Sequence, residues 1–317
     1  MDTTRTMLYS SRDLFNKRFL SAAISVALTI AFLTPVASNA SRGGVERTNN
    51  SFAVGMTFNN FGQEEVCSGA LISPTFILTA AHCLINENGQ KHTDYIFTAP
   101  GKRLDDPVNP ATMPKILKSY IPSNYVNSNY QDGDDIAFIQ LDKPLATKGF
   151  IRIATPKEVA ELFDGDALSG FGYGAVYETG ASYSIYPREY PLYWSNRGDA
   201  STLKTNQVIG YSSVACAGDS GGPIVHEIST GNFVLIGNMS GAASVSNKCG
   251  AKAADGNFYM RMTVAHFYLP LVQSELTKSL ATPKPAPKII KITCVKGKVK
   301  KVISGTNPKC PSGYRKA

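Results

Sequence analysis

Short apolar runs recur between residues 50 and 262, and each is bounded by Gly, Pro, Asn or Asp. Short runs rich in β-forming residues between such turn residues predict β-strands. These runs include Ser68–Leu78, Ile136–Leu141, Ala167–Phe171, Val208–Tyr211, Phe233–Asn238 and Asn257–Met262. Since no amphipathic helix separates them, the pattern favours an all-β fold, an antiparallel barrel or sandwich, over an α/β fold.

The C-terminal part of the chain has three further patterns. Val264–Leu280 predicts a helix, in which Pro270 indicates a late start or a kink. Alternating prolines in residues 282–288 remove backbone donors and favour an extended linker. Residues 289–317 then alternate apolar and basic positions around turn residues, which predicts a small β-hairpin module closed by a disulfide.

Residues 1–40 have the pattern of a secretory signal peptide. Four basic residues precede an apolar run from Phe19 to Val36, and the small residues Ser38 and Ala40 follow it. A single membrane anchor is the alternative, because the run is near the length that spans a bilayer. Ser, Thr and Pro residues dilute the run, so we expect cleavage after Ala40 and a secreted, extracellular protein with no transmembrane segment after cleavage.

Composition indicates a folded protein, with 43% hydrophobic residues and 18% charged residues. The formal net charge of +8 is unevenly distributed. Residues 284–317 hold ten Lys or Arg and no Asp or Glu, whereas residues 41–283 carry a net charge of −4. The basic tail could bind an anionic cell-surface polymer or membrane surface, or it could be a solvated appendage, and it lacks the interleaved aromatic residues that would favour nucleic acid.

Six cysteines in an exported chain are better interpreted as disulfides than as reduced thiols. Six cysteines allow fifteen pairings, and spacing alone does not choose among them. A zinc site would need paired ligands at short spacing, and the sequence contains no C-x-x-C or H-x-x-x-H. We therefore expect neither a metal nor a cofactor.

Three separated segments hold the residue types that acyl transfer needs. A histidine follows an apolar run in Leu78–Cys83 (LTAAHC), a carboxylate begins Asp134–Leu141 (DDIAFIQL), and a serine lies among glycines in Gly218–Pro223 (GDSGGP). A serine nucleophile requires an imidazole that takes its proton and a carboxylate that orients the imidazole. Each motif alone is weak evidence, but independent false matches rarely occur in one functional order.

The order and separation of these motifs resemble the trypsin/chymotrypsin-like serine protease family across residues 43–280. The resemblance implies a double antiparallel β-barrel (chymotrypsin-like) with a C-terminal helix, in a protease domain at 41–281. It makes Ser220 the nucleophile, His82 the general base and then acid, and Asp135 the orienting carboxylate. Asp134 is the rival carboxylate, one residue out of the family register. The backbone N–H groups of Gly218 and Ser220 would form the oxyanion hole.

The resemblance also implies disulfide pairings. Cys67 would pair with Cys83, and Cys216 with Cys249. Cys294 and Cys310 then remain for the basic tail. Bridges beside the histidine and beside the nucleophile loop would hold both catalytic segments in place.

Specificity is inferred from the position six residues before the nucleophile, where the family uses an aspartate to select Arg or Lys. Here that residue is Val214, and burying an unpaired cation against valine is costly. We expect a preference for small or medium apolar side chains, although Asp255 could supply a charge near the other wall. The expected pocket residues are Val214, Ala215, Ser240, Gly241 and Ala242.

The start of the expected mature chain departs from the family pattern. Family members usually begin with Ile-Val-Gly-Gly after processing, and this chain has Ser-Arg-Gly-Gly at residues 41–44. Our hypothesis is that signal cleavage directly frees the Ser41 ammonium to form an ion pair with Asp219. No separate pro-peptide is then needed.

Other functions remain as alternatives. The GDSGG segment also satisfies the G-x-S-x-G pattern of α/β-hydrolases, but that pattern requires a helix after the serine, and Pro223 with a β-rich run follows here. His226 and His266 are therefore interpreted as surface or packing residues. A catalytically silent homologue that acts as a surface-binding protein, or an esterase of small acyl esters, would also fit this fold.

Overall fold

The computed structural model describes the polypeptide in ten ranges, and the predicted signal peptide and the Pro-rich linker lie outside them. Ser41, Tyr211 and Cys249 also lie outside, so the hypotheses about Ser41 and Cys249 remain predictions. The described ranges are 44–86, 89–109, 111–125, 134–176, 182–195, 205–210, 214–242, 252–281, 290–305 and 308–317.

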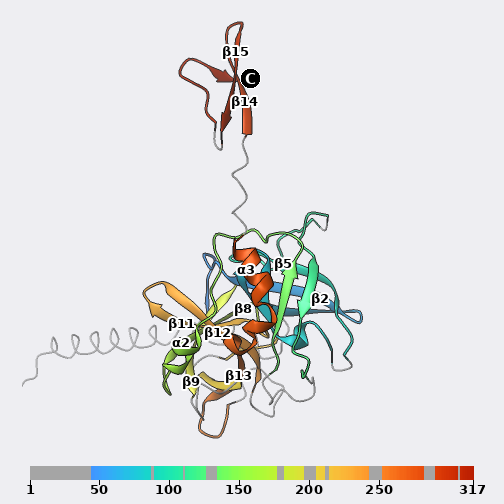
Figure 1. The fold of residues 1–317 in the computed structure, drawn as a ribbon, viewed down its shortest axis with the longest axis vertical. Coiled ribbons are helices and arrows are strands. Elements are labelled where there is room, and N and C mark those ends of the chain that lie inside the picture. Colours follow the sequence, from blue (N-terminus) through green and yellow to red (C-terminus); the bar gives the residue numbers. More distant parts are fainter. Residues whose placement is uncertain are drawn as a thin grey trace, which may run out of the picture. The chain divides into compact units, whose positions relative to one another are not determined.

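Six antiparallel strands form the N-terminal barrel, in the spatial order β5-β2-β3-β4-β7-β6 (Figure 1). Alternate side chains of these strands point inward, because successive residues of a strand face opposite sides of a sheet. Val54, Met56, Leu71, Ile77 and Ile139 are fully buried in the resulting core. The strands are β2 (Ala53–Asn60), β3 (Gln63–Ser73), β4 (Phe76–Thr79), β5 (Thr93–Thr98), β6 (Ile116–Tyr120) and β7 (Ala137–Leu141).

A second ring of six strands closes because β8 pairs with both β9 and β11. Trp194, Tyr190, Leu192 and Met260 are fully buried in its core. A short strand, β1 (Val45–Glu46), adds to β9 outside the ring. The ring contains β8 (Ala167–Gly172), β9 (Arg188–Ser195), β10 (Thr205–Gly210), β11 (Pro223–Ser229), β12 (Asn232–Ala242) and β13 (Phe258–Val264).

A third apolar cluster joins the two barrels to the helical segment that follows them. Phe52 of the first barrel meets Phe171 of the second edge to face, with ring centroids 5.1 Å apart. The same cluster buries Phe138 and, from the C-terminal helix α3 (Gln273–Ala281), Leu276. The prediction of a double antiparallel β-barrel with a C-terminal helix is confirmed.

Two of the predicted elements are each divided into two segments in the structure. The run Ser68–Leu78 is two strands, β3 and β4, because the chain turns at residues 74–75. The predicted helix Val264–Leu280 begins as a 3₁₀ segment, Ala265–Leu271, and becomes α-helical only at Gln273. Pro270 lies inside the 3₁₀ segment, where its missing N–H removes an α-helical hydrogen bond. The late start that proline indicates is confirmed.

One short helix, α2 (Pro156–Ala160), was missed. The Thr155 hydroxyl accepts a hydrogen bond from the Glu158 N–H at 3.3 Å, and the Glu158 carboxylate accepts one from the Thr155 N–H at 2.8 Å. This reciprocal pair is a capping box, with proline at the first helical position. The sequence Thr-Pro-Lys-Glu is its signature, so the helix was detectable.

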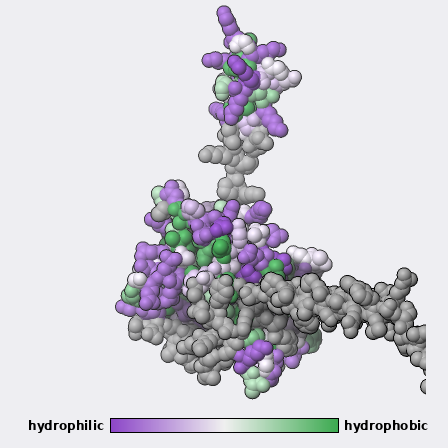
Figure 2. Space-filling model, turned by 180° about the vertical axis from the view of Figure 1, so that it is seen from behind, coloured by the Kyte–Doolittle hydropathy of each residue, from purple (hydrophilic) through white to green (hydrophobic). Residues whose placement is uncertain are grey.

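The C-terminal module is described by itself. Strands β14 (Ile290–Lys296) and β15 (Val299–Gly305) pair antiparallel, which is the hairpin that the alternation predicts. A third strand, β16 (Arg315–Lys316), pairs with β14 and was not predicted. Cys294 and Cys310 are joined by a disulfide. Hydrophilic side chains cover most of the visible face of this module (Figure 2).

Candidate active site

His82 lies in a single 3₁₀ turn, Ala81–Cys83, directly after β4. The apolar residues before it are fully buried, so the strand anchors the turn. Cys83 is bonded to Cys67 of β3, which ties the turn to the neighbouring strand. Only the imidazole of the turn is partly exposed, with 20% of its side-chain surface accessible.

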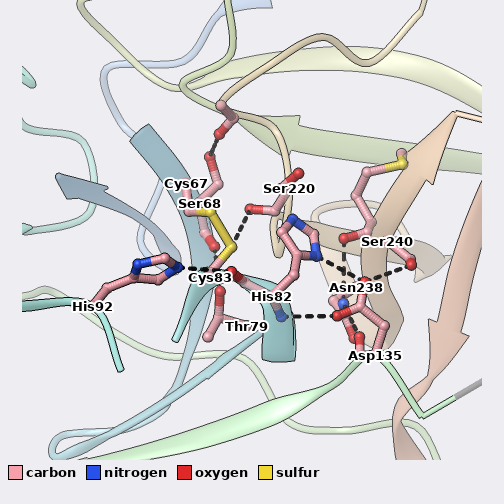
Figure 3. The surroundings of a disulfide bond; sticks show 12 residues. Cys67, Ser68, Thr79, His82, Cys83, His92, Asp135, Ser220, Asn238 and Ser240 are labelled. Atoms are coloured by element: carbon pink, nitrogen blue, oxygen red, sulfur yellow. Dashed lines mark hydrogen bonds and ion pairs between the residues drawn. A yellow bond between two sulfur atoms is a disulfide. The ribbon is translucent and has the colours of Figure 1, made fainter. Parts of the chain in front are cut away.

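Asp135 reaches His82 because of strand pairing in the first barrel. β7 follows Asp135 and lies beside β4, with Ala137 opposite Thr79. The Asp135 Oδ2 atom lies 2.8 Å from His82 Nδ1, and Asp135 Oδ1 accepts the backbone N–H of His82 at 3.1 Å. Two separate oxygens of one carboxylate therefore hold the ring and the backbone of the same histidine (Figure 3).

Groups from the second barrel hold Asp135 in turn. The Ser240 hydroxyl donates to Asp135 Oδ2 at 2.6 Å, and the Asp135 carbonyl accepts from Asn238 Nδ2 at 3.1 Å and Thr263 Oγ1 at 3.2 Å. Asp135 is only 1% exposed. A buried carboxylate with this many donors has little freedom to rotate, so the orientation of His82 is set by both barrels.

The close pair shifts both pKa values in opposite directions. Burial alone lowers the pKa of His82, but the charge and the hydrogen bond of Asp135 outweigh it and raise the pKa above its ordinary 6.5. Burial tends to raise the pKa of Asp135, but His82 and the Ser240 hydroxyl lower it below its ordinary 3.8. Asp135 is thus ionised at neutral pH, and the pair favours a charge on the imidazole.

Asp134, the rival carboxylate, has other partners. Its Oδ1 atom accepts the Tyr268 hydroxyl at 2.6 Å, and its Oδ2 atom accepts the Asn124 amide. Tyr268 belongs to the apolar cluster between the barrels. The carboxylate bound to His82 is therefore that of Asp135, and Asp134 anchors the chain just before it.

Ser220 lies in a tight turn at the start of the second barrel's β11. Gly218 and Gly221 have φ values of +94° and +77°, a region that side chains with a Cβ rarely adopt. The Ser220 carbonyl accepts the Ser68 N–H at 2.8 Å, and the Ser68 hydroxyl donates to the Gly218 carbonyl, also at 2.8 Å. The His82 ring lies between Asp135 and Ser220 (Figure 3).

Close packing explains why this turn needs glycine. A Cβ atom at Gly221 would lie 2.1 Å from the Thr79 hydroxyl and 2.4 Å from the Ser68 carbonyl oxygen. Any larger residue would push the turn away from the first barrel, and Ser220 with it. Within the described residues, the N–H groups of Gly218 and Ser220 donate to no acceptor.

The comparison with protein families agrees with this geometry. A family model described as Trypsin matches residues 41–267, which is more than half of the chain. The chain belongs to the trypsin family. One similar relative is the suppressor of tumorigenicity 14 protein homolog of Bos taurus, 27% identical over 192 residues. The match covers 56% of this trypsin-family chain and only 22% of that relative.

Asp219, beside the candidate nucleophile of this trypsin-family chain, is fully buried. It accepts the N–H groups of Gly174 at 2.9 Å and Cys216 at 2.8 Å. A Cβ atom at Gly174 would lie 2.2 Å from its carboxylate, so glycine allows the close approach. The predicted partner, the Ser41 ammonium, lies outside the described residues.

The predicted specificity residues occupy different environments. Val214 is 5% exposed and belongs to the core of the second barrel, and the Ala215 N–H lies 3.2 Å from the Met260 sulfur. Ser240 uses its hydroxyl on Asp135, a contact the sequence analysis missed. Asp255 is exposed and accepts the Tyr259 hydroxyl at 2.6 Å. Gly241 lies in β12, and the Ala242 side chain is outside the described part.

His226 and His266 have local contacts. His226 Nδ1 lies 3.1 Å from the Ala167 carbonyl, and His266 lies against Phe267 with tilted rings and 4.1 Å between ring centroids. Cys67, His82 and Cys83 lie close enough to hold a metal ion, but the two sulfur atoms are bonded to each other. A disulfide offers no thiolate ligand, so these three residues are not suited to bind zinc.

Proposed function

We propose that the chain is a serine endopeptidase in which His82, Asp135 and Ser220 form the catalytic triad. The observation that carries the proposal is the 2.8 Å contact between His82 Nδ1 and a buried carboxylate that both barrels hold. That contact assigns the proton to Nδ1, which leaves Nε2 as the acceptor for the Ser220 hydroxyl. Membership of the trypsin family supports the same assignment.

In the first half of the reaction, Ser220 Oγ attacks the carbonyl carbon of the scissile peptide bond while His82 Nε2 takes its proton. The tetrahedral intermediate collapses, the C–N bond breaks, and His82 gives the proton to the departing amine. In the second half, water attacks the acyl-enzyme, His82 takes a proton from it, and the acid product leaves as Ser220 regains its proton. Asp135 stays ionised throughout and stabilises the imidazolium.

The N–H groups of Gly218 and Ser220 would stabilise the oxyanion of the intermediate. Both belong to the turn that contains the nucleophile, so one short segment supplies the nucleophile and the donors. Donors that are already in place need no reorganisation when the charge develops.

We further propose a preference for small or medium apolar side chains before the scissile bond. Val214 offers no charge or hydrogen bond, and the Ser240 hydroxyl is occupied by Asp135. Asp255 is exposed at the turn before β13 and hydrogen-bonded to Tyr259, which does not favour a role as a buried counter-ion. A buried lysine or arginine would therefore lack a partner among the pocket residues that the structure describes.

For activation, we propose that cleavage after Ala40 frees the Ser41 ammonium to pair with Asp219. Asp219 accepts two backbone N–H groups and lies directly before Ser220 in the nucleophile turn, so a cation bound there would act on that turn. The ammonium would order the adjoining nucleophile turn by occupying this site.

Secretion and surface attachment are part of the same proposal. Among the described residues, no helix is both long and apolar enough to cross a membrane. The C-terminal module carries eight Lys or Arg and no Asp or Glu over residues 290–317, which favours binding to an anionic cell-surface polymer. The chain would then be secreted and held at the cell surface by its C-terminal module.

A peptide panel tests the catalytic proposal. The wild-type chain should hydrolyse peptides with Ala, Val or Leu before the scissile bond faster than the matched Arg peptide. Ser220→Ala should lose at least about 10⁴-fold in kcat. Ser229→Ala, at the exposed end of β11, is the matched control and should keep full activity. Hydrolysis of esters without peptide cleavage would favour the esterase, and a folded but inactive wild type would favour the silent homologue.

A further inference from the structure

A cavity of about 450 Å³ lies between the segment that follows His82 and strand β6. Its size falls within the range of pockets that hold small ligands. Six of its ten lining residues are aliphatic or aromatic, and the other four are Lys91, His92, Lys118 and Ser119. The apolar wall consists of Leu84, Ile85, Tyr95, Ile116, Leu117 and Ile121.

The charged groups of this cavity are both cations. Lys91 and Lys118 line it, and among the residues that the structure describes no carboxylate does. Lys118 Nζ lies 4.3 Å from the centroid of the Tyr120 ring, so its ammonium stays at the surface near an aromatic face. Leu117, which also lines the cavity, is 64% exposed, so part of the apolar wall is open to solvent. An apolar wall with a cationic rim matches a ligand with an apolar chain and an anionic end.

His92 connects this cavity with the candidate active site. It lines the cavity, is 7% exposed and lies 4.7 Å from the Phe58 ring between centroids. His92 Nε2 lies 3.3 Å from the carbonyl oxygen of His82 (Figure 3). Burial lowers the pKa of His92, so the ring is neutral at pH 7 and donates its one N–H to that carbonyl. Nδ1 is buried and has no hydrogen-bond partner among the described residues.

We propose that this cavity, the His92 pocket, binds an aliphatic carboxylate, and that its occupancy is coupled to His82 through the hydrogen bond from His92. The apolar chain would contact the Leu and Ile wall, and the carboxylate would meet Lys91 and Lys118. Movement of His92 on binding shifts the donor on the His82 carbonyl, and so the backbone that carries the imidazole. Binding is independent of the proposed peptidase, whereas the coupling rests on it.

Binding is measured by calorimetry on the Ser220→Ala chain, which is not consumed by self-digestion, with octanoate as the probe. Octanoate should bind at least tenfold more tightly than octylamine or 1-octanol. The double substitution Lys91→Ala and Lys118→Ala should weaken octanoate at least tenfold. Lys148→Ala with Lys157→Ala, two exposed lysines that do not line the cavity, should leave it unchanged. Equal binding of the three probes, or no effect of the pocket substitutions, would overturn the proposal.

Coupling is measured as the effect of octanoate on kcat/KM of the wild-type chain. His92→Phe retains a ring against Phe58 but cannot donate to His82, so octanoate should still bind and should no longer change kcat/KM. An unchanged response in this variant would refute the coupling. If the peptidase proposal fails instead, no substrate is hydrolysed at all, while octanoate binding remains measurable.

The natural carboxylate has two possible sources, a free fatty acid or an aliphatic segment with an acidic residue in a polypeptide. Competition separates them. Displacement of octanoate by an acetylated Leu-Val-Leu-Asp amide, and not by its Asn counterpart, assigns the pocket to polypeptide. Retention of octanoate against both peptides assigns it to the free acid. Equal displacement by both peptides contradicts recognition of a carboxylate.

Discussion

At the scale of single residues, Asp135 contacts groups of both barrels and so connects both to the imidazole of His82. Its carboxylate contacts His82 of the first barrel and Ser240 of the second. Its carbonyl is held by Asn238 and Thr263, which belong to neighbouring strands. Loss of this carboxylate should therefore change both the geometry and the basicity of His82.

The pH dependence of activity tests this directly. A protonated His82 cannot accept the Ser220 proton, so kcat/KM should fall with falling pH, with a midpoint above 6.5, since Asp135 raises the pKa of His82. Asp135→Asn removes that influence and leaves burial, which lowers the pKa. The kcat of Asp135→Asn should be roughly 10⁴-fold lower than that of the wild-type chain, and the pH midpoint of the remaining activity should be lower.

Asp134→Asn is the control for this experiment. Its carboxylate is held by Tyr268 and Asn124, so the pH midpoint should stay at the wild-type value even if the chain loses stability. A shift as large as that of Asp135→Asn would contradict the separate assignment of the two carboxylates. pH profiles of kcat/KM on one apolar peptide measure both variants.

Single-residue roles were only partly predictable. The motif spacing identified His82, Asp135 and Ser220 as one group, and the structure brings His82 and Asp135 into contact. Ser240 was expected only as a pocket wall, because its contact with Asp135 crosses 105 residues of sequence. Asn238 and Thr263 were missed for the same reason. Local sequence carries no signal for such pairs.

At the scale of elements, the turn that carries His82 depends on its disulfide to β3. Cys67 and Cys83 close a loop with a sequence separation of 16, and removing such a bridge costs about 3 kcal/mol of unfolding free energy. The double variant Cys67→Ser and Cys83→Ser should show this loss in chemical denaturation. It should also lose activity, since the turn would be less ordered.

The chain contains a matched control. Cys294 and Cys310 have the same sequence separation of 16, but they lie in the C-terminal module. Cys294→Ser with Cys310→Ser should leave the main unfolding transition and the peptidase activity unchanged. Equal destabilisation of that transition by both double variants would refute a specific role for the bridge at His82.

Arg188 of β9 holds the first described strand. The residue is 9% exposed, donates to the Gly44 carbonyl, and lies 3.4 Å from the Glu46 carboxylate. Burial lowers its pKa, and the charges of Glu46 and Asp219 oppose that shift. Arg188→Met should cost about 2 kcal/mol of unfolding free energy and reduce the fraction of active sites in a burst titration.

Arg47 provides the comparison for Arg188. It pairs with Glu189 at 2.6 Å on the same strand pair, but 44% of its side chain is exposed. Surface ion pairs contribute about 0–1 kcal/mol, so Arg47→Met should be nearly neutral in both measurements. If the two substitutions had equal effects on unfolding free energy and on the fraction of active sites, the burial of Arg188 beside β1 would not explain its contribution.

Element prediction succeeded where turn-forming residues bound a short β-rich run on both sides. Ile136–Leu141 and Ala167–Phe171 match β7 and β8 to within one residue at each end. The run Ser68–Leu78 failed as one strand because Pro74 lies in a turn between two strands of similar composition. Apolar content alone does not reveal a turn when the residues on both sides are buried.

At the scale of the whole molecule, the net charge is −4 over residues 41–283, which contain the trypsin-family match, and +10 over residues 284–317. The strand register places Lys291, Lys300 and Arg315 on one face of the module's sheet. The opposite face contains Cys294, whose side chain is buried, and Lys301, whose ammonium lies over Tyr314. The face that holds Lys291, Lys300 and Arg315 is therefore the more accessible to a ligand.

Replacing Lys291, Lys300 and Arg315 with Gln should weaken retention on an anionic polymer matrix more than replacing Lys296, Lys301 and Lys316. Both triple variants lose the same charge, so only position differs. Retention of the wild-type chain should also decrease with added salt, as expected for exposed charges. Equal retention of both variants would contradict a preferred face, and kcat/KM on soluble peptides should stay at the wild-type value in each.

The central claim is that Ser220 is a nucleophile activated by His82 and Asp135. The most direct measurement is labelling of the purified chain with a fluorophosphonate, followed by mass spectrometry of its peptides. We predict one adduct, on Ser220, that is absent in Ser220→Ala and strongly slowed in His82→Ala. A folded wild-type chain that forms no adduct, or an adduct on another serine, would contradict the account.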